Sequence, residues 1–259
     1  MYKKVIESKL KRAISILLIM ALAFSVSIVK PEEVEAAAQV SVHDPSIVKA
    51  GDTYYIFGSH MAWAKSKDLK NWQTFTMNIN TNYSNMYGTV WNNWCGYNAS
   101  GNKISISDNV NGLHANLWAP DVIWNETMQK WCMYMSNNGI DTSHNSVITL
   151  ATADQIEGPY TYAGEVVYSG FTNKGVQLFS KTDYKKVTGD TSVNSRYLNA
   201  NGTWNSNYGP NCIDPCVKYD DNGELWMTYG SWFGGIYAIK LDAKTGLRDY
   251  SKTYTTVAN

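Results

Sequence analysis

Three aspartates beside prolines are the residues of this sequence with the clearest capacity for chemistry. Asp44 and Asp214 each precede a proline, and Asp121 follows one. Each pair leads into a short apolar run, a polar turn and an aromatic run that ends in serine. The three copies cover residues 42–59, 119–136 and 213–231. Carboxylates that meet at one place can divide the roles of general acid and general base. A single Asp-Pro pair would indicate only a turn, so the acid/base hypothesis depends on the repetition.

The elements that must position these aspartates are short strands. From Val40 onward, β-branched or aromatic runs alternate with Gly, Asn and Asp, and no long stretch has a helical period. Strands are predicted at 46–49, 53–58, 61–66, 121–124, 130–136, 146–151, 216–219, 224–229 and 235–241. Repeated antiparallel sheets of this kind are typical of a β-propeller, in which similar blades surround one axis. If each aspartate enters the innermost strand of its blade, the carboxylates lie on one rim of the central channel.

Two long insertions separate the copies. The marker aspartates are 77 and 93 residues apart, against roughly 40–50 residues in compact propeller repeats. The extra residues lie at 78–116 and 171–211 and are rich in Asn, Ser, Gly, Tyr and Trp. We expect the insertions to form the walls of a cleft above the rim. Convergent carboxylates between aromatic walls are the outline of a polysaccharide site.

The first 38 residues have the composition of a secretory signal. A lysine-rich start precedes an apolar run at 13–29 and small residues at 36–38. An uncleaved membrane anchor is the alternative, although the apolar run lies at the short end of the spanning range. We therefore expect residues 1–38 to be a cleaved signal peptide and residues 39–259 to form a secreted, extracellular domain without membrane attachment.

Charge and aromatic content restrict the class of ligand. The chain has a formal net charge of zero, and removal of residues 1–38 leaves 16 basic and 18 acidic residues without a basic stripe. Nucleic acid and anionic membranes are therefore not expected as partners. The 10 Trp and 18 Tyr against 6 Phe favour rings that pack in cores and also stack on sugars. We expect a monomer that binds a neutral, hydroxyl-rich ligand.

Metal binding is not predicted from the residues themselves. Cys95, Cys132, Cys212 and Cys216 could form disulfides outside the cell, but they lack the paired spacing of a zinc site. The four histidines show no pairing either. Free or buried thiols are the simpler interpretation.

Four motifs, taken in order, resemble glycoside hydrolase family 43. They are HDPSI at 43–47, LWAPDVIW at 117–124, IEGPY at 156–160 and CIDPCVKYDDNGELWMTYGSWFGGI at 212–236. Among the members of that family, the secreted endo-1,5-α-L-arabinanases look most similar. The resemblance implies a five-bladed β-propeller, of which this chain would supply about the first three blades. It also implies inverting hydrolysis of internal α-1,5-L-arabinofuranosyl linkages in arabinan. An exo-acting arabinofuranosidase or β-xylosidase of the same family and a non-catalytic polysaccharide-binding propeller are the alternatives.

The resemblance also carries over residue roles. It makes Asp44 the general base, and Asp214 the residue that raises the pKa of the general acid and orients it. An inverting enzyme needs its base and its protonated acid on opposite faces of the sugar, roughly 6.5–9.5 Å apart. The expected substrate contacts are His43, Trp118, Asp121 and Ser231.

The general acid of the family is a glutamate in a later blade, which would lie beyond Asn259. Glu157 is interpreted as part of a structural turn and Glu224 as an exposed hairpin residue, so we expect this chain alone to be inactive. Family members also hold a calcium ion in the central channel. The sequence has no acidic loop of the EF-hand type, so a structural calcium ion rests on the resemblance alone.

Overall fold

The computed structural model describes residues 38–75, 79–98, 101–105, 116–139, 145–231, 233–251 and 255–258, with the backbone alone at 79–81, 231, 233 and 255–258. The signal peptide predicted for residues 1–38 falls outside these ranges, apart from Ala38. In the described part of the chain, no helix is long and apolar enough to cross a membrane.

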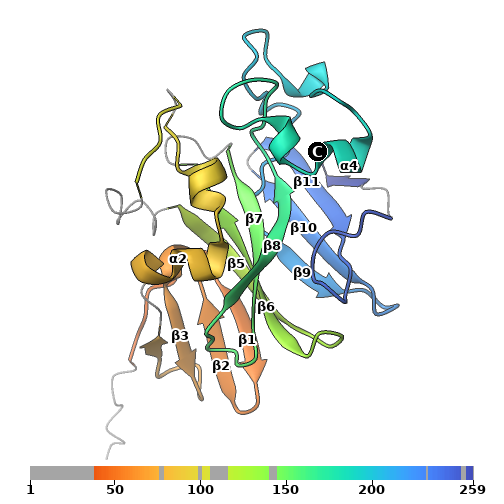
Figure 1. The fold of residues 1–259 in the computed structure, drawn as a ribbon. Helices are drawn as coiled ribbons and strands as arrows, with labels where there is room; N and C mark the ends of the chain where they lie inside the picture. Colours follow the sequence, from red (N-terminus) through yellow and green to blue (C-terminus); the bar gives the residue numbers. More distant parts are fainter. Residues whose placement is uncertain are drawn as a thin grey trace, which may run out of the picture. The chain divides into compact units, whose positions relative to one another are not determined.

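The described residues form three antiparallel sheets of four strands each, and the strands of every sheet follow one another in sequence order (Figure 1). The first sheet contains β1 (Ser46–Ala50), β2 (Thr53–Phe57), β3 (Trp63–Ser66) and β4 (Gln73–Phe75). The second contains β5 (Leu117–Asn125), β6 (Lys130–Asn137), β7 (Val147–Ala153) and β8 (Thr161–Tyr168). The third contains β9 (Cys216–Tyr219), β10 (Leu225–Ser231), β11 (Phe233–Lys240) and β12 (Thr255–Ala258). The predicted all-β class with repeated sheets is confirmed.

Tight turns join the first two strands of each sheet, and a residue in each of these turns adopts the left-handed backbone that the turn requires. In the third sheet, the carboxylate of Asp220 accepts the N–H groups of Asn222 (2.9 Å) and Glu224 (2.8 Å). Gly223 completes this turn at φ +77°, a left-handed conformation that glycine adopts without a Cβ clash. Local turns of this kind set the register of each hairpin.

The second sheet is buried on both faces. Along β6, Met133 and Met135 join the core cluster shared with the first sheet, whereas Cys132 and Tyr134 join the cluster shared with the third. Alternate residues of a strand point to opposite faces, so an unbroken apolar strand is the expected sequence of a sheet covered on both sides. The first strands of the sheets follow one another as neighbours, since β5 contacts both β1 and β9.

Both insertions contain helical segments that the sequence analysis did not predict. The first insertion includes α2 (Ile79–Tyr87) and a π-helical turn, η2 (Trp91–Cys95). The second includes α4 (Tyr184–Thr188) between the 3-10 turns η4 (Phe179–Lys181) and η5 (Ser195–Tyr197). A further 3-10 turn, η1 (Ser59–Met61), follows β2. The predicted third strand of the first sheet accordingly starts at Trp63 and not at Met61.

Candidate active site

The residue before proline at the entrance to each sheet has the same unusual backbone. Asp44, Ala119 and Asp214 have φ angles of +48°, +38° and +54°. A left-handed conformation is uncommon for residues other than glycine, and the surrounding structure must impose it. The three repeats therefore align on these positions, which contain two aspartates and one alanine.

The three marker aspartates do not occupy equivalent places in their sheets. Asp121 lies opposite Tyr134 in the strand pairing, as Ser46 lies opposite Phe57. It thus occupies the place after proline, whereas Asp44 occupies the place before it. In the sequence, an Asp-Pro pair and a Pro-Asp pair look similar. In all three sheets, however, the residue before the proline has the left-handed backbone, and Asp121, which follows it, does not.

Asp44 is held at one oxygen and open at the other. Its Oδ2 accepts a hydrogen bond from the Ser59 hydroxyl at 2.7 Å, and Nδ1 of His43 lies at ion-pair distance, 2.7 Å, from the same oxygen. The Asp44 side chain is 42% exposed and that of His43 is 77% exposed. No further hydrogen-bond partner of Asp44 occurs among the described residues. An exposed carboxylate with one available oxygen is suited to take a proton from water.

Asp121 has both carboxylate oxygens bound to protein. Its Oδ1 accepts the hydroxyl of Ser46 (2.7 Å) and the N–H of Val122 (3.1 Å), and its Oδ2 accepts the N–H of Val217 (2.6 Å). Burial raises the pKa of Asp121, and these hydrogen bonds, led by that of Val217, oppose the rise. The side chain joins β1, β5 and β9, so its visible role is to hold the three sheets together. The substrate contact expected of Asp121 stays a prediction.

The backbone around Asp214 repeats the backbone around Asp44. The N–H of Gly230 donates to the carbonyl before Asp214 at 2.9 Å, as the N–H of Ser59 donates to the carbonyl before Asp44 at 2.9 Å. Asp214 is half-buried. The structure therefore gives the two aspartates corresponding places in the first and third sheets.

The remaining predicted contacts are placed only in part. Trp118 lies half-buried at the start of β5, next to Ala119. Ser231 ends β10 after a register shift, and its side chain lies outside the described residues. His43 lies directly against Asp44, where it can orient the carboxylate. His114 and His144 are also outside the described residues.

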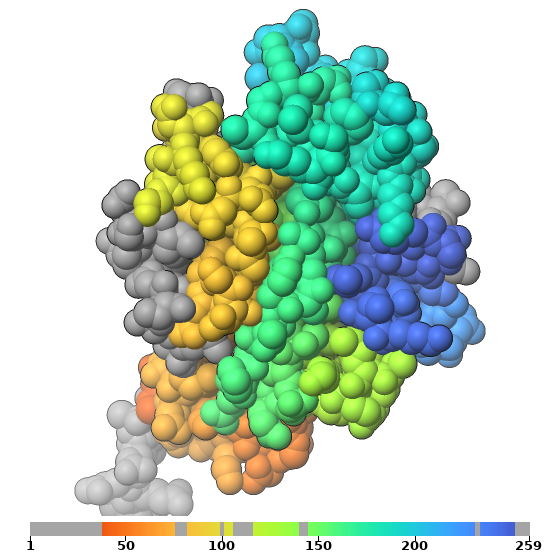
Figure 2. Space-filling view, in the orientation of Figure 1, coloured from red at the N-terminus to blue at the C-terminus, as the bar shows by residue number. Residues whose placement is uncertain are grey.

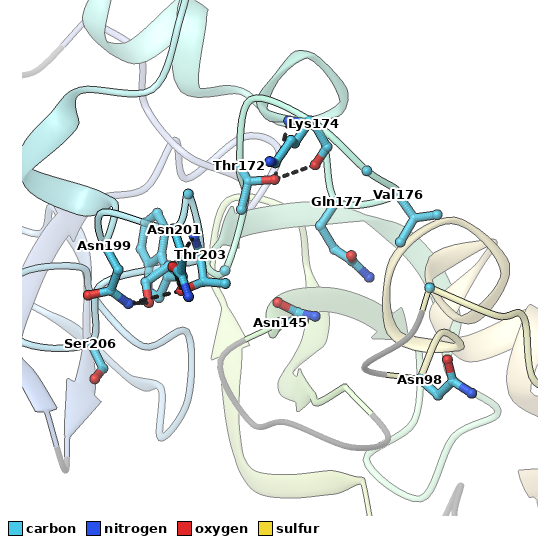
Figure 3. Close-up of a pocket in the computed structure, with 15 residues that line it drawn as sticks. Asn98, Asn145, Thr172, Lys174, Val176, Gln177, Asn199, Asn201, Thr203 and Ser206 are labelled. Carbon is cyan, nitrogen blue, oxygen red and sulfur yellow. Dashed lines mark hydrogen bonds between the residues drawn. The ribbon is translucent and has the colours of Figure 1, made fainter.

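The two insertions meet around a polar cavity of about 700 Å³. A hydrogen bond of 3.0 Å from the Gln177 amide to the Trp94 carbonyl joins them, and Figure 2 shows the two insertions side by side. Among the described residues that line the cavity there is no carboxylate, and Lys174 is the one charged residue. Figure 3 shows the lining side chains, which include Asn98, Asn145, Asn199, Asn201, Thr172, Thr203 and Gln177. The predicted walls therefore enclose a groove of amides and hydroxyls.

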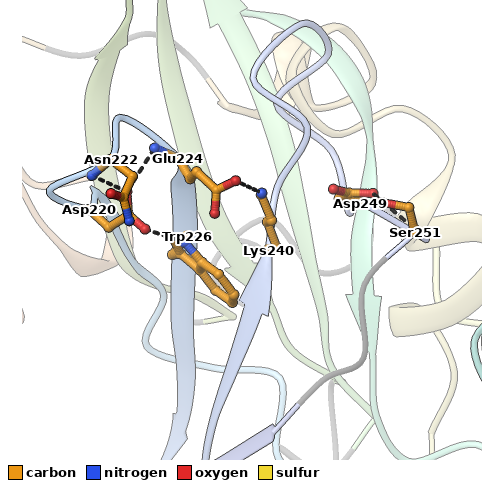
Figure 4. A network of polar contacts seen from close by, with 7 residues as sticks. All are labelled: Asp220, Asn222, Glu224, Trp226, Lys240, Asp249 and Ser251. Atoms are coloured by element: carbon orange, nitrogen blue, oxygen red, sulfur yellow. Dashed lines mark hydrogen bonds and ion pairs between the residues drawn. The ribbon is translucent and has the colours of Figure 1, made fainter.

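The glutamates of the described chain lie away from the sheet entrances. Glu126 and Glu224 are in the turns that end β5 and β9, at the opposite ends of these strands. Glu224 forms an ion pair with Lys240, shown in Figure 4. Glu157, in the β7–β8 turn, pairs with Lys65 at 2.8 Å, which agrees with a structural role. Glu165 lies in β8, the last strand of its sheet.

Metal ligands do not gather in the described part of the chain. No group of three or more His, Cys, Asp or Glu side chains there could hold a metal ion, and its four cysteines are free thiols. Both oxygens of Asp121 are already hydrogen-bonded. These residues do not fit a calcium ion on their own, and calcium stays a prediction that rests on the family.

Comparison with known proteins defines the class. Residues 37–179 match the family described as glycosyl hydrolases family 43. The chain belongs to this family, as its motifs predicted.

Individual proteins of the family show which members this chain is similar to. The chain is 36% identical over 216 residues to an extracellular endo-α-(1→5)-L-arabinanase of Thermotoga petrophila, covering 80% of this chain and 37% of that protein. It is 33% identical over 211 residues to an extracellular endo-α-(1→5)-L-arabinanase of Bacillus subtilis, covering 80% and 36%. A crystal structure of the endo-1,5-α-L-arabinanase from Thermotoga petrophila matches with a TM-score of 0.58 and 31% identity, over 86% of this chain and 42% of that one. The chain thus spans less than half the length of these relatives.

Proposed function

We propose that the full-length protein containing this chain hydrolyses internal α-1,5-L-arabinofuranosyl linkages of arabinan outside the cell, with inversion. Family membership and the names of the two arabinanase relatives support the substrate class. The observation that carries the mechanism is the geometry of Asp44: one oxygen accepts the Ser59 hydroxyl and lies 2.7 Å from His43 Nδ1, and the other has no hydrogen-bond partner among the described residues. We further propose that the three sheets are blades of a five-bladed propeller.

In this mechanism Asp44 is the general base. Its open Oδ1 takes a proton from a water molecule as the water oxygen attacks the anomeric carbon on one face of the sugar. The glycosidic bond breaks as a protonated carboxylic acid on the other face gives its proton to the leaving oxygen. We assign that acid to a glutamate outside this chain, because the glutamates described here lie away from the sheet entrances. Asp214 would keep the acid protonated through its negative charge.

Binding of the polysaccharide is assigned to the rim and to the groove between the insertions. Trp118, beside Ala119, would stack on a sugar, since flat apolar ring faces suit the apolar faces of sugars. The groove, with amide and hydroxyl groups and about 700 Å³ of space, falls in the size range of ligand sites. Its near absence of charge suits a neutral polysaccharide.

The test compares substrates and products with the full-length protein. Debranched linear arabinan, xylan and an aryl arabinofuranoside are incubated in parallel, and products are separated by size. We expect arabino-oligosaccharides of several lengths from arabinan and little from the other two. Release of arabinose alone would favour exo action, as in a relative from Cellvibrio japonicus named an exo-α-(1→5)-L-arabinofuranosidase at 27% identity. No hydrolysis of arabinan would contradict the proposal.

A further inference from the structure

The buried hydroxyl of Ser59 lies between the first two sheets and touches Asp44. Ser59 is 1% exposed. Its Oγ accepts the backbone N–H of Ala119 at 2.7 Å and lies 2.7 Å from Oδ2 of Asp44. A backbone N–H can only donate, and a hydroxyl has a single proton to give. That proton is therefore directed at the carboxylate.

Nδ1 of His43 lies at ion-pair distance, 2.7 Å, from the same oxygen of Asp44. The hydrogen bond from Ser59 and the close His43 ring both act on Oδ2, so they restrict the rotation of the carboxylate and leave Oδ1 for the water molecule. We propose that Ser59 is a positioning residue, which holds Oδ2 so that Oδ1 faces the attacking water. This inference rests on the proposed role of Asp44 as general base. Ser59 keeps its own proton throughout, and the proton of the water goes to Oδ1.

The other sheets show that the fold does not require this hydrogen bond. Ser136 occupies the matching place in the second sheet, two residues after Tyr134, as Ser59 lies two residues after Phe57. Ser136 is 0% exposed, and its hydroxyl has no hydrogen-bond partner in the described part of the chain. In the third sheet the matching residue is Gly230, which has no side chain. Of these three places, only the one beside Asp44 has a serine whose hydroxyl donates to a carboxylate.

The experiment uses the full-length protein with debranched arabinan. Ser59→Ala and the near-isosteric Ser59→Cys remove or weaken the donor, and Ser136→Ala is the matched control for loss of a buried hydroxyl. We expect kcat to fall about 10- to 100-fold in Ser59→Ala, as for one hydrogen bond to a charged group, with KM within about twofold. Ser59→Cys should lie between Ser59→Ala and the wild type. Ser136→Ala should keep kcat within about twofold of the wild type.

A double-mutant cycle separates positioning from a general structural effect. In an Asp44→Asn background, Ser59→Ala should change the residual rate by less than about twofold, because its effect acts through the Asp44 carboxylate. An equal loss in both backgrounds, a wild-type kcat in folded Ser59→Ala, or unfolding of both Ser59 variants where Ser136→Ala stays folded would overturn the inference alone. An inactive wild-type protein, or an Asp44→Asn variant with the wild-type rate, would overturn the proposed mechanism as well.

Discussion

The entrances to the first and second sheets share a backbone and differ in their chemistry. Both have a left-handed residue before proline, but it is Asp44 in the first and Ala119 in the second. The carboxylate of the second sheet, Asp121, lies after the proline with both oxygens bound to protein. The comparison shows that a repeated backbone can present a reactive group at one entrance and a structural link at the next.

A large loss of activity is also expected from a change at the third entrance, where Asp214 precedes proline. If the place before proline determines function, Asp214→Asn should behave like a change at Asp44. We expect kcat of the full-length protein to fall about 10²-fold or more while the midpoint of thermal unfolding stays nearly constant, since Asp214 would act on the acid electrostatically. Steady-state kinetics and calorimetry measure both. A large loss of stability with unchanged kcat would place Asp214 with Asp121 instead.

Asp121→Ala should chiefly lower stability. The change leaves the N–H of Val217 without its acceptor and removes the link between β5 and β9. An unsatisfied buried donor costs about 1–3 kcal/mol, and we expect a loss of that size in urea unfolding. Ser46→Ala, which removes a single hydroxyl partner of Asp121, is the control with a smaller expected loss. Equal stability of Asp121→Ala and the wild type would contradict the assigned link.

The stability difference between the wild type and Asp121→Asn should depend on pH. Burial raises the pKa of Asp121 in the folded protein, so on acidification the folded form takes up the proton before the unfolded chain does. The wild type should therefore gain stability relative to Asp121→Asn as the pH falls from 7 through the raised folded pKa. Urea unfolding at several pH values measures this difference. A difference that shifts against the wild type on acidification would show that the pKa is lowered.

The smallest effect is expected at Glu157. Its ion pair with Lys65 is partly exposed, and such pairs contribute about 0–1 kcal/mol. Glu157→Gln should lower the free energy of unfolding by about 1 kcal/mol or less and leave kcat of the full-length protein unchanged. Glu126→Gln, in another exposed turn, is the control. A large fall in kcat for Glu157→Gln alone would make Glu157 the general acid.

Much of the sheet structure followed from local sequence. The predicted strand at 216–219 has the observed bounds, and the other hairpins differ at their ends by a few residues. Local turn chemistry explains this success, because Asp220 and Gly223 specify their turn through neighbouring residues alone.

The helices of the first insertion have a sequence pattern that is typical of helices. The buried residues at spacings of three and four are Tyr83, Met86, Tyr87, Val90, Trp91 and Trp94. This is the spacing of one face of a helix, obscured by the many Asn and Ser between them. The place of Asp121 in its sheet did not follow from local sequence. It depends on which residue beside the proline has the left-handed backbone. In the second sheet that residue is Ala119, whose N–H donates to the Ser59 hydroxyl of the neighbouring sheet.

The most direct test of the difference between the two entrances is a pair of isosteric changes in the full-length protein, Asp44→Asn and Asp121→Asn. Their kcat on debranched arabinan is measured below the unfolding temperature of both. We expect a loss of about 10²–10⁴-fold for Asp44→Asn, as for removal of a general base, and a kcat within a few-fold of the wild type for Asp121→Asn. Near-normal turnover by Asp44→Asn, or an equal loss in both variants, would contradict it.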